Sequence, residues 1–227
     1  MAVTWAEVAA RTPLYLNMGG KGHCDPHAPY ERFVSVDLAP GRGWRVTHDL
    51  RQPLPLDDAS VDGIHTEDCF AYFTPNELTA LFAECHRVLK PGGRLRVAVP
   101  DFEHPRHKTR VKNGKDTAHP EHHNLPTKHN MEALLQASPF TDWTFYHYWK
   151  DGTFIQEPID YTLGWVKRTP DNDPRNHSIR PKGYAKNLLF LLSRGFFTSE
   201  SERAAWLEGQ PYFITSLVFD CIKSKKA

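Results

Sequence analysis

A short apolar strand that runs directly into a glycine-rich turn constrains this sequence most. Residues 14–18 form a compact apolar run, and Gly19-Gly20-Lys21-Gly22 stops it. Glycine adopts backbone conformations that other residues avoid, and it lets a ligand approach the main chain. In an open α/β sheet, ligands bind beyond the carboxyl ends of the strands. The first strand and its turn therefore predict an α/β fold and the place of its site.

The other apolar runs follow in the order of a parallel sheet. Thr74-Pro75-Asn76-Glu77 predicts the start of a helix, because Thr is a good cap, Pro suits the first turn and Glu follows three residues later. Strands that alternate with helices form parallel sheets with right-handed crossovers. Residues 143–149 and 212–222 alternate like strands, and they can pair antiparallel. We expect a short helix within 1–11 and further strands at 33–37, 44–49, 61–65 and 95–99.

Composition narrows the class of protein. The 28 Lys and Arg residues nearly balance the 27 Asp and Glu residues, and a net charge of +1 does not draw a chain of 227 residues to nucleic acid or anionic lipid. No stretch approaches the ~20 apolar residues of a membrane span. The start lacks the pattern of a signal peptide, and no cysteines have C-x-x-C spacing, so we expect a cytoplasmic protein. The length predicts a single domain over 1–227 with insertions at 102–130 and 150–211.

An acidic residue at the end of the second predicted strand points to a ligand. Asp37 closes the run Phe33-Val34-Ser35-Val36, and its carboxylate can accept hydrogen bonds from both hydroxyls of a ribose. The glycine-rich turn and this acid, in this order, predict an adenosine-containing cofactor. The alternative is that Asp37 only caps the next turn.

Four segments and the closing strands carry a family resemblance: LYLNMGGKGH, FVSVDLAP, HDLRQPLPLDDASVDGIHTEDCFAYF, ECHRVLKPGGRLRVAVPD, TFYHYW and YFITSLVFDCIK. They resemble the class I S-adenosylmethionine-dependent methyltransferases, in particular the small type-11-like group. The resemblance covers residues 14–101 and, loosely, the last strands. It implies a Rossmann-like sheet of seven mostly parallel strands with an antiparallel last strand, S-adenosylmethionine as cofactor, and the two insertions as lid and acceptor pocket.

The resemblance also implies a set of cofactor contacts. By position, the methionyl part would face the first turn, the ribose would meet Asp37, the adenine would lie beside Leu38, and Asp49 and Leu50 would meet the adenine edge. The turn consists of Asn17, Gly19, Gly20, Lys21 and Gly22. It departs from the family, since Asn17 replaces an acid and Lys21 and His23 replace glycines. Lys21 could pair with the cofactor carboxylate or crowd the pocket.

Residues 67–72 would face the sulfonium and the substrate. Tyr72 is the preferred aromatic partner of that cation. Transfer to an O–H or N–H acceptor needs a base, and the candidates by position are Glu67, Asp68, Asp101 and His123.

Six histidines lie between positions 104 and 129. Their spacing fits no closed zinc pattern and no cysteine joins them, so we expect no metal. One of His122, His123 or His129 can contact substrate or act as the base. The surrounding basic residues suggest a solvated loop or, alternatively, a site for an acidic substrate group.

Three functions stay open from the sequence. The first is methyl transfer to a small molecule. The second is cyclisation of S-adenosylmethionine itself with release of methylthioadenosine, since azetidine-2-carboxylate synthases look similar to this group. The third is a non-catalytic module that binds a partner protein. Nucleic-acid modification is disfavoured, because HTEDCF stands where an N/D-P-P-Y-type motif would follow the fourth strand. The oligomeric state is not set by the sequence, and a homodimer is one alternative.

Overall fold

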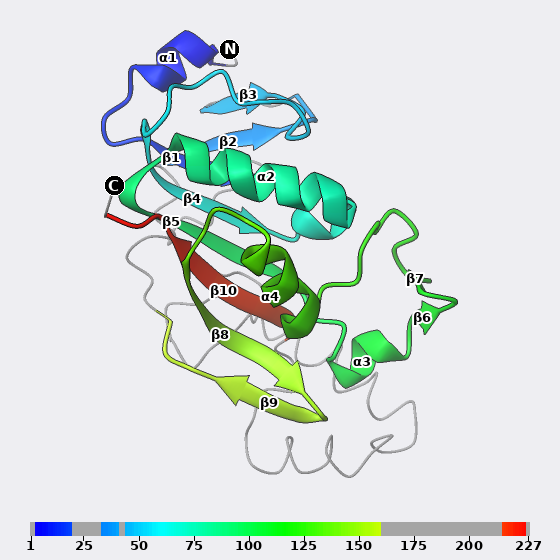
Figure 1. The fold of residues 1–227 in the computed structure, drawn as a ribbon. Helices are drawn as coiled ribbons and strands as arrows, with labels where there is room; N and C mark the ends of the chain where they lie inside the picture. The colour runs from blue at the N-terminus through cyan, green and yellow to red at the C-terminus, as the bar shows by residue number, and fades with distance from the viewer. Residues whose placement is uncertain (1–2, 20–32, 41–43, 160–214, 226–227) are drawn as a thin grey trace, which may run out of the picture.

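The computed structural model describes residues 3–19, 33–40, 44–159 and 215–225. Within these ranges the chain builds one large sheet in the order β3-β2-β1-β4-β5-β10-β8-β9 (Figure 1). The strands are β1 Tyr15–Met18, β2 Phe33–Asp37, β3 Arg45–Thr47, β4 Val61–Glu67, β5 Leu89–Pro100, β8 Asp142–Lys150, β9 Thr153–Gln156 and β10 Ser216–Ile222.

Strand order reverses at the centre of this sheet. β1 pairs in parallel with β2 on one side and with β4 on the other. The chain therefore moves outward through β2 and β3 in one direction and through β4 and β5 in the other. Such a switch point leaves a crevice at the carboxyl ends of the strands, where ligands bind. The predicted Rossmann-like α/β class is confirmed.

The two closing strands pair as the sequence predicted. β10 lies antiparallel between β5 and β8. β9 adds an eighth strand to the seven that were expected, because Asp151 and Gly152 form a tight hairpin turn after β8. Both turn residues have positive φ, at 51° and 77°, as a two-residue turn of this type requires.

Three helices begin with the same N-terminal capping box. The caps of α1 (Trp5–Ala9), α2 (Pro75–Val88) and α4 (Lys128–Gln136) are threonines that exchange hydrogen bonds with the third residue of the helix. The predicted start of α2 at Thr74 is thereby confirmed. α2 and α4 cover the same face of the sheet (Figure 1). The stripe that α2 buries there consists of Leu78, Leu81, Phe82, Cys85 and Val88.

β5 begins earlier than predicted. The strand starts at Leu89, directly after α2, whereas the apolar pattern indicated a start at Leu95. Gly92 has a φ of +81° and donates its N–H to the carbonyl of Lys223 at 2.7 Å, so the glycine turn itself pairs with the end of the chain. No helix in the described ranges is long and apolar enough to cross a membrane.

Candidate active site

The turn after β1 packs directly against the segment that follows β4. Gly19 has a φ of +71°, and a Cβ atom built on it would fall 2.5 Å from the Cβ of Cys69. Its N–H donates to the carbonyl of Val36 at 2.8 Å, which ties the turn to β2. Only glycine fits both the backbone and the space. Asn17 is half-buried in β1, aligned with Ser35 and His65 of the neighbouring strands. The predicted contacts at Gly20, Lys21 and Gly22, and the departure at His23, lie outside the described residues.

Asp37 is the last residue of β2, at the carboxyl edge of the sheet. Its Oδ1 accepts the N–H of Ala39 at 2.8 Å and lies 3.1 Å from Nη2 of Arg45 on β3. The carboxylate is thus held in one orientation and still has a second oxygen for a ligand. Leu38, the next residue, is 60% exposed, which is unusual for a large apolar side chain. This pair fits a sugar diol with a flat apolar ring beside it.

Asp49 and Leu50 follow β3. Oδ1 of Asp49 accepts the N–H of Arg51 at 3.0 Å, so the carboxylate closes its own turn. Leu50 points into the core and is 7% exposed, which leaves only its main chain for a ligand. The role of these two residues at an adenine edge remains a prediction.

The chain turns sharply where β4 ends. Glu67 is the last, half-buried residue of β4, and Asp68 follows with a φ of 58°. The N–H of Asp68 donates to the carbonyl of Ala98 on β5 at 2.8 Å. The short helix η2 (Phe70–Tyr72) then leaves Tyr72 40% exposed at the sheet edge. A left-handed non-glycine residue costs about 1–3 kcal/mol and is typical of functional sites.

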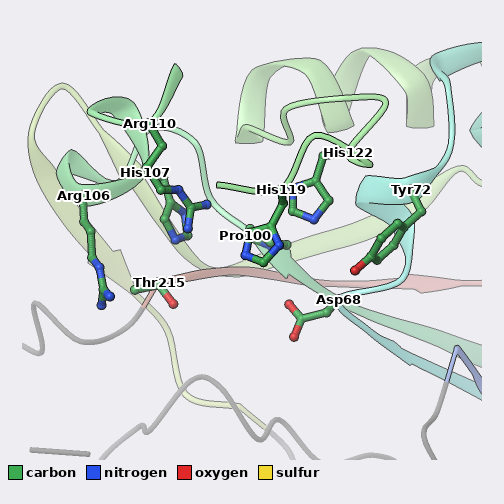
Figure 2. Close-up of a pocket in the computed structure, with 9 residues that line it drawn as sticks. All are labelled: Asp68, Tyr72, Pro100, Arg106, His107, Arg110, His119, His122 and Thr215. Carbon is green, nitrogen blue, oxygen red and sulfur yellow. The ribbon is translucent and has the colours of Figure 1, made fainter. Parts of the chain in front are cut away.

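A cavity of about 270 Å³ lies beyond this edge (Figure 2). Its floor comes from the carboxyl ends of β4 and β5 and from the residue before β10. Asp68 and Tyr72 mark one end and Arg106 marks the other, with the rings of His119 and His122 between them. Five of the nine lining residues come from the segment 102–130. The lining consists of Asp68, Tyr72, Pro100, Arg106, His107, Arg110, His119, His122 and Thr215.

A small hairpin shapes the wall of this cavity. α3 (Pro105–Lys108) leads into β6 (Val111–Lys112) and β7 (Lys115–Asp116), which pair antiparallel. Asn113 and Gly114 make the turn with φ values of 50° and 71°. The hairpin brings Asp116 back against Arg110 and fully buries its carboxylate.

Asp116 holds two cavity residues in place. Its Oδ2 lies 3.0 Å from Nη2 of Arg110 and 3.1 Å from Nδ1 of His122, and its Oδ1 accepts the N–H of Ala118 at 2.9 Å. The His122 ring stacks on His119 at 5.0 Å between centroids and meets Tyr72 edge-on at 5.2 Å. Burial lowers the pKa of His122, although Asp116 opposes the shift. The ring is therefore neutral at neutral pH.

Asp101, one of the four predicted bases, does not line the cavity. It is fully buried, and its carboxylate accepts the N–H groups of Trp149 at 2.7 Å and Glu103 at 2.9 Å. Burial raises its pKa to about 7. Its main-chain oxygen lies 2.7 Å from Nδ1 of His107, whose pKa burial lowers to about 2. This geometry favours a positioning role for Asp101 over proton transfer to a ligand.

His123, the histidine predicted as a base, has an exposed side chain. Its N–H donates to the carbonyl of Ala71 at 2.9 Å, so its main chain clamps the loop onto η2. The neighbouring His122 instead carries its ring into the cavity. One sequence feature could have indicated that His122 enters the cavity. Asn113-Gly114 is typical of a tight hairpin turn, and this hairpin determines the position of Asp116, which binds His122. Among the described residues, no group of three or more His, Cys, Asp or Glu side chains has the geometry to hold a metal ion.

Comparisons with known proteins agree with this fold. A family model described as a methyltransferase domain matches residues 28–97. A solved S-adenosylmethionine-dependent methyltransferase from Archaeoglobus fulgidus superposes with a TM-score of 0.55 at 15% identity, over 97% of this chain and 95% of that one. The chain has the class I methyltransferase fold. No curated protein matches the sequence at a significant level.

Two further solved structures share this methyltransferase fold. One is a methyltransferase from Thermotoga maritima described as a possible histamine N-methyltransferase, with a TM-score of 0.54, 15% identity and coverage of 93% of this chain and 82% of that one. The other is phosphoethanolamine N-methyltransferase 2 from Haemonchus contortus in complex with S-adenosyl-L-methionine, with a TM-score of 0.50 and 14% identity. That match covers 93% of this chain and 49% of the other protein. At these identities the likeness concerns the fold.

Proposed function

We propose that this chain transfers a methyl group from S-adenosylmethionine to a small molecule held in the cavity beside η2. The observation that carries the proposal is the position of that cavity. Its Asp68–Tyr72 end directly follows β4, the strand next to β1 and its glycine turn. A cofactor over β1 and β2 and an acceptor over β4 and β5 would meet at this end, which is what direct transfer between two bound molecules requires.

The described residues fit the cofactor. Gly19 has a φ of +71° and packs against Cys69 where a side chain would not fit, which starts the glycine-rich turn at the carboxyl end of β1, where ligands bind in this fold. Asp37 is fixed by Arg45 and offers a carboxylate oxygen to the ribose hydroxyls. Leu38 offers an exposed apolar surface to the adenine. When bound, the cofactor supplies an activated methyl group on a sulfonium, and the protein aligns the acceptor and excludes water.

The size and lining of the cavity support a small acceptor. A volume of about 270 Å³ is at the lower end for pockets that bind small molecules. Its lining is mainly polar, with histidine and arginine side chains around one tyrosine, which suits a polar acceptor. This supports transfer to a second molecule over cyclisation of S-adenosylmethionine.

Mass spectrometry of the purified protein tests the proposal. S-adenosylmethionine is incubated with the protein alone and with a panel of small amines, phenols and hydroxy acids. We expect S-adenosylhomocysteine and a product 14 mass units heavier than one acceptor, with an intact cofactor when no acceptor is present. Formation of methylthioadenosine and a cyclic amino acid from the cofactor alone would contradict methyl transfer and show that the reaction is cyclisation.

A further inference from the structure

We propose that His122, oriented by Asp116, is the general base that removes the proton of the methyl acceptor, and that the acceptor is therefore an O–H or N–H compound. The inference rests on the proposed methyl transfer and names its base and acceptor class. His122 lines the cavity and meets the ring of Tyr72 edge-on, near the end where the two bound molecules would meet (Figure 2).

Asp116 is built to hold one imidazole in one orientation. Its carboxylate is fully buried and is fixed by Arg110 at 3.0 Å and by the N–H of Ala118 at 2.9 Å. The arginine compensates the buried negative charge, so the carboxylate stays ionised and able to accept a hydrogen bond. The remaining partner of Oδ2 is Nδ1 of His122 at 3.1 Å.

This contact sets the proton on the imidazole. An ionised carboxylate only accepts hydrogen bonds, so Nδ1 of His122 must carry the hydrogen and Nε2 must carry the lone pair. The His122 side chain is 5% exposed and is held between the stacked ring of His119 and the edge of Tyr72. A carboxylate that fixes the tautomer and stabilises the cation formed on protonation is the arrangement of known histidine bases.

Several charged or titratable groups act on this ring. Asp116 and Glu121 favour its protonation, whereas His119 and, above all, burial oppose it. Arg110 acts through the carboxylate that it shares with the ring. Burial outweighs the carboxylates, and the ring is neutral at neutral pH, as a base must be before it takes a proton.

The step balances in atoms and charge. A lone pair on the acceptor oxygen or nitrogen forms the bond to the methyl carbon, and the carbon–sulfur bond breaks with its electron pair on sulfur. The acceptor loses one proton, which Nε2 of His122 takes while Nδ1–H stays bonded to Asp116. The imidazolium then releases that proton to water, and the dyad returns to its starting state.

The first test is nuclear magnetic resonance on the whole chain with ¹⁵N-labelled histidine and bound S-adenosylhomocysteine. The His122 signals are assigned by their loss in His122→Asn. We expect a neutral ring at pH 7.5 with the hydrogen on Nδ1, and a loss of that preference in Asp116→Asn. A hydrogen on Nε2, or a doubly protonated ring at pH 7.5, would overturn the proposal.

The second test is kinetic and uses whichever amine, phenol or hydroxy acid of the panel gives the fastest release of S-adenosylhomocysteine. We expect His122→Asn to lower kcat by about 10²–10⁴-fold with an unchanged Kd for S-adenosylmethionine. His86→Asn, an imidazole loss on α2 away from the cavity, should leave kcat unchanged. In the unmodified chain kcat should rise with pH through an apparent pKa below 6.5. In His122→Asn this rise of kcat with pH should be absent.

If His122→Asn binds S-adenosylmethionine and its kcat stays within threefold of the unmodified value, His122 is not the base, and the proposed methyl transfer is unaffected. If the unmodified chain does not bind S-adenosylmethionine, the proposed function and the dyad both fall.

Discussion

Gly19 and Cys69 lie closer together than any side chain at position 19 would allow. A Cβ atom there would fall 2.5 Å from the Cβ of Cys69 and 2.6 Å from its Sγ. The first residue belongs to the turn after β1 and the second to the segment that leads into η2. The start of the turn proposed to hold the cofactor is therefore packed against the segment between Asp68 and Tyr72, and a change in either should affect the other.

Gly19→Ala should destabilise the fold and abolish cofactor binding. The left-handed backbone costs about 1–2 kcal/mol for alanine, and overpacking against Cys69 adds roughly 1–3 kcal/mol. Gly114→Ala is the matched control, because Gly114 has the same φ of +71° with no atom within 4 Å of the added Cβ. We expect Gly114→Ala to lower the free energy of unfolding by the backbone contribution alone, as measured by denaturant unfolding. Equal losses in the two variants would refute the contact with Cys69.

The burial of Asp101 should make stability depend on pH. Its pKa is raised from 3.8 to about 7, so between these values the folded chain keeps a proton that the unfolded chain has released. The contribution of Asp101 to the free energy of unfolding should then fall as pH rises from about 4 through 7, whereas the buried imidazole of His107, whose pKa is lowered to about 2, contributes with the opposite sign. Asp101→Asn should remove this contribution, so its stability relative to the unmodified chain should change between pH 4 and 7, and it should cost about 1–3 kcal/mol at pH 6, because one of its amide N–H groups would face a backbone donor.

Denaturant unfolding across this pH range checks the prediction. Asp57→Asn, in an exposed turn, serves as the control and should reproduce the unmodified curve. A curve for Asp101→Asn that runs parallel to the unmodified one would show that another group carries the pH dependence.

Removing one partner of the Arg96–Asp220 ion pair should lower the free energy of unfolding strongly, whereas replacing both partners with apolar residues should lower it much less. Two hydrogen bonds of 2.8 Å join the guanidinium of Arg96 on β5 to Asp220 on β10, and both side chains are buried. Arg96→Met should cost roughly 3–5 kcal/mol, because among the described residues it leaves the buried carboxylate with Arg94, at 3.1 Å, as its one cationic partner. The double variant with Asp220→Leu should recover most of that loss. The four unfolding free energies form a cycle, and strict additivity would contradict a direct interaction.

Local patterns predicted the order of the strands and helices along the chain well. β2 was expected at residues 33–37 and spans Phe33–Asp37, because five residues of alternating or apolar character have no competing helical period. The start of α2 followed from the cap at Thr74. The early start of β5 was missed because Lys90-Pro91-Gly92-Gly93 has the composition of a turn, and its pairing with Lys223 depends on a segment far along the chain.

The site was predicted less completely, and for a physical reason. The residues after β1, β2 and β4 are fixed by strand ends, which a sequence can place. His122 and His123 are neighbours, and only the hairpin at Asn113-Gly114 and the burial of Asp116 decide which ring enters the cavity. Asp101 had the right residue type at the end of a strand, but its carboxylate is taken up by the main chain of β8.

Calorimetric titration of S-adenosylmethionine into the purified chain tests the central claim most directly. We predict saturable binding of one molecule per chain, competed by S-adenosylhomocysteine. Asp37→Asn should weaken this binding at least tenfold, because it removes the negative charge and replaces one of the two acceptor oxygens with an NH2 donor. Asp57→Asn should leave it unchanged. Absence of binding to the unmodified chain, or equal affinity in the Asp37 variant, would contradict the account.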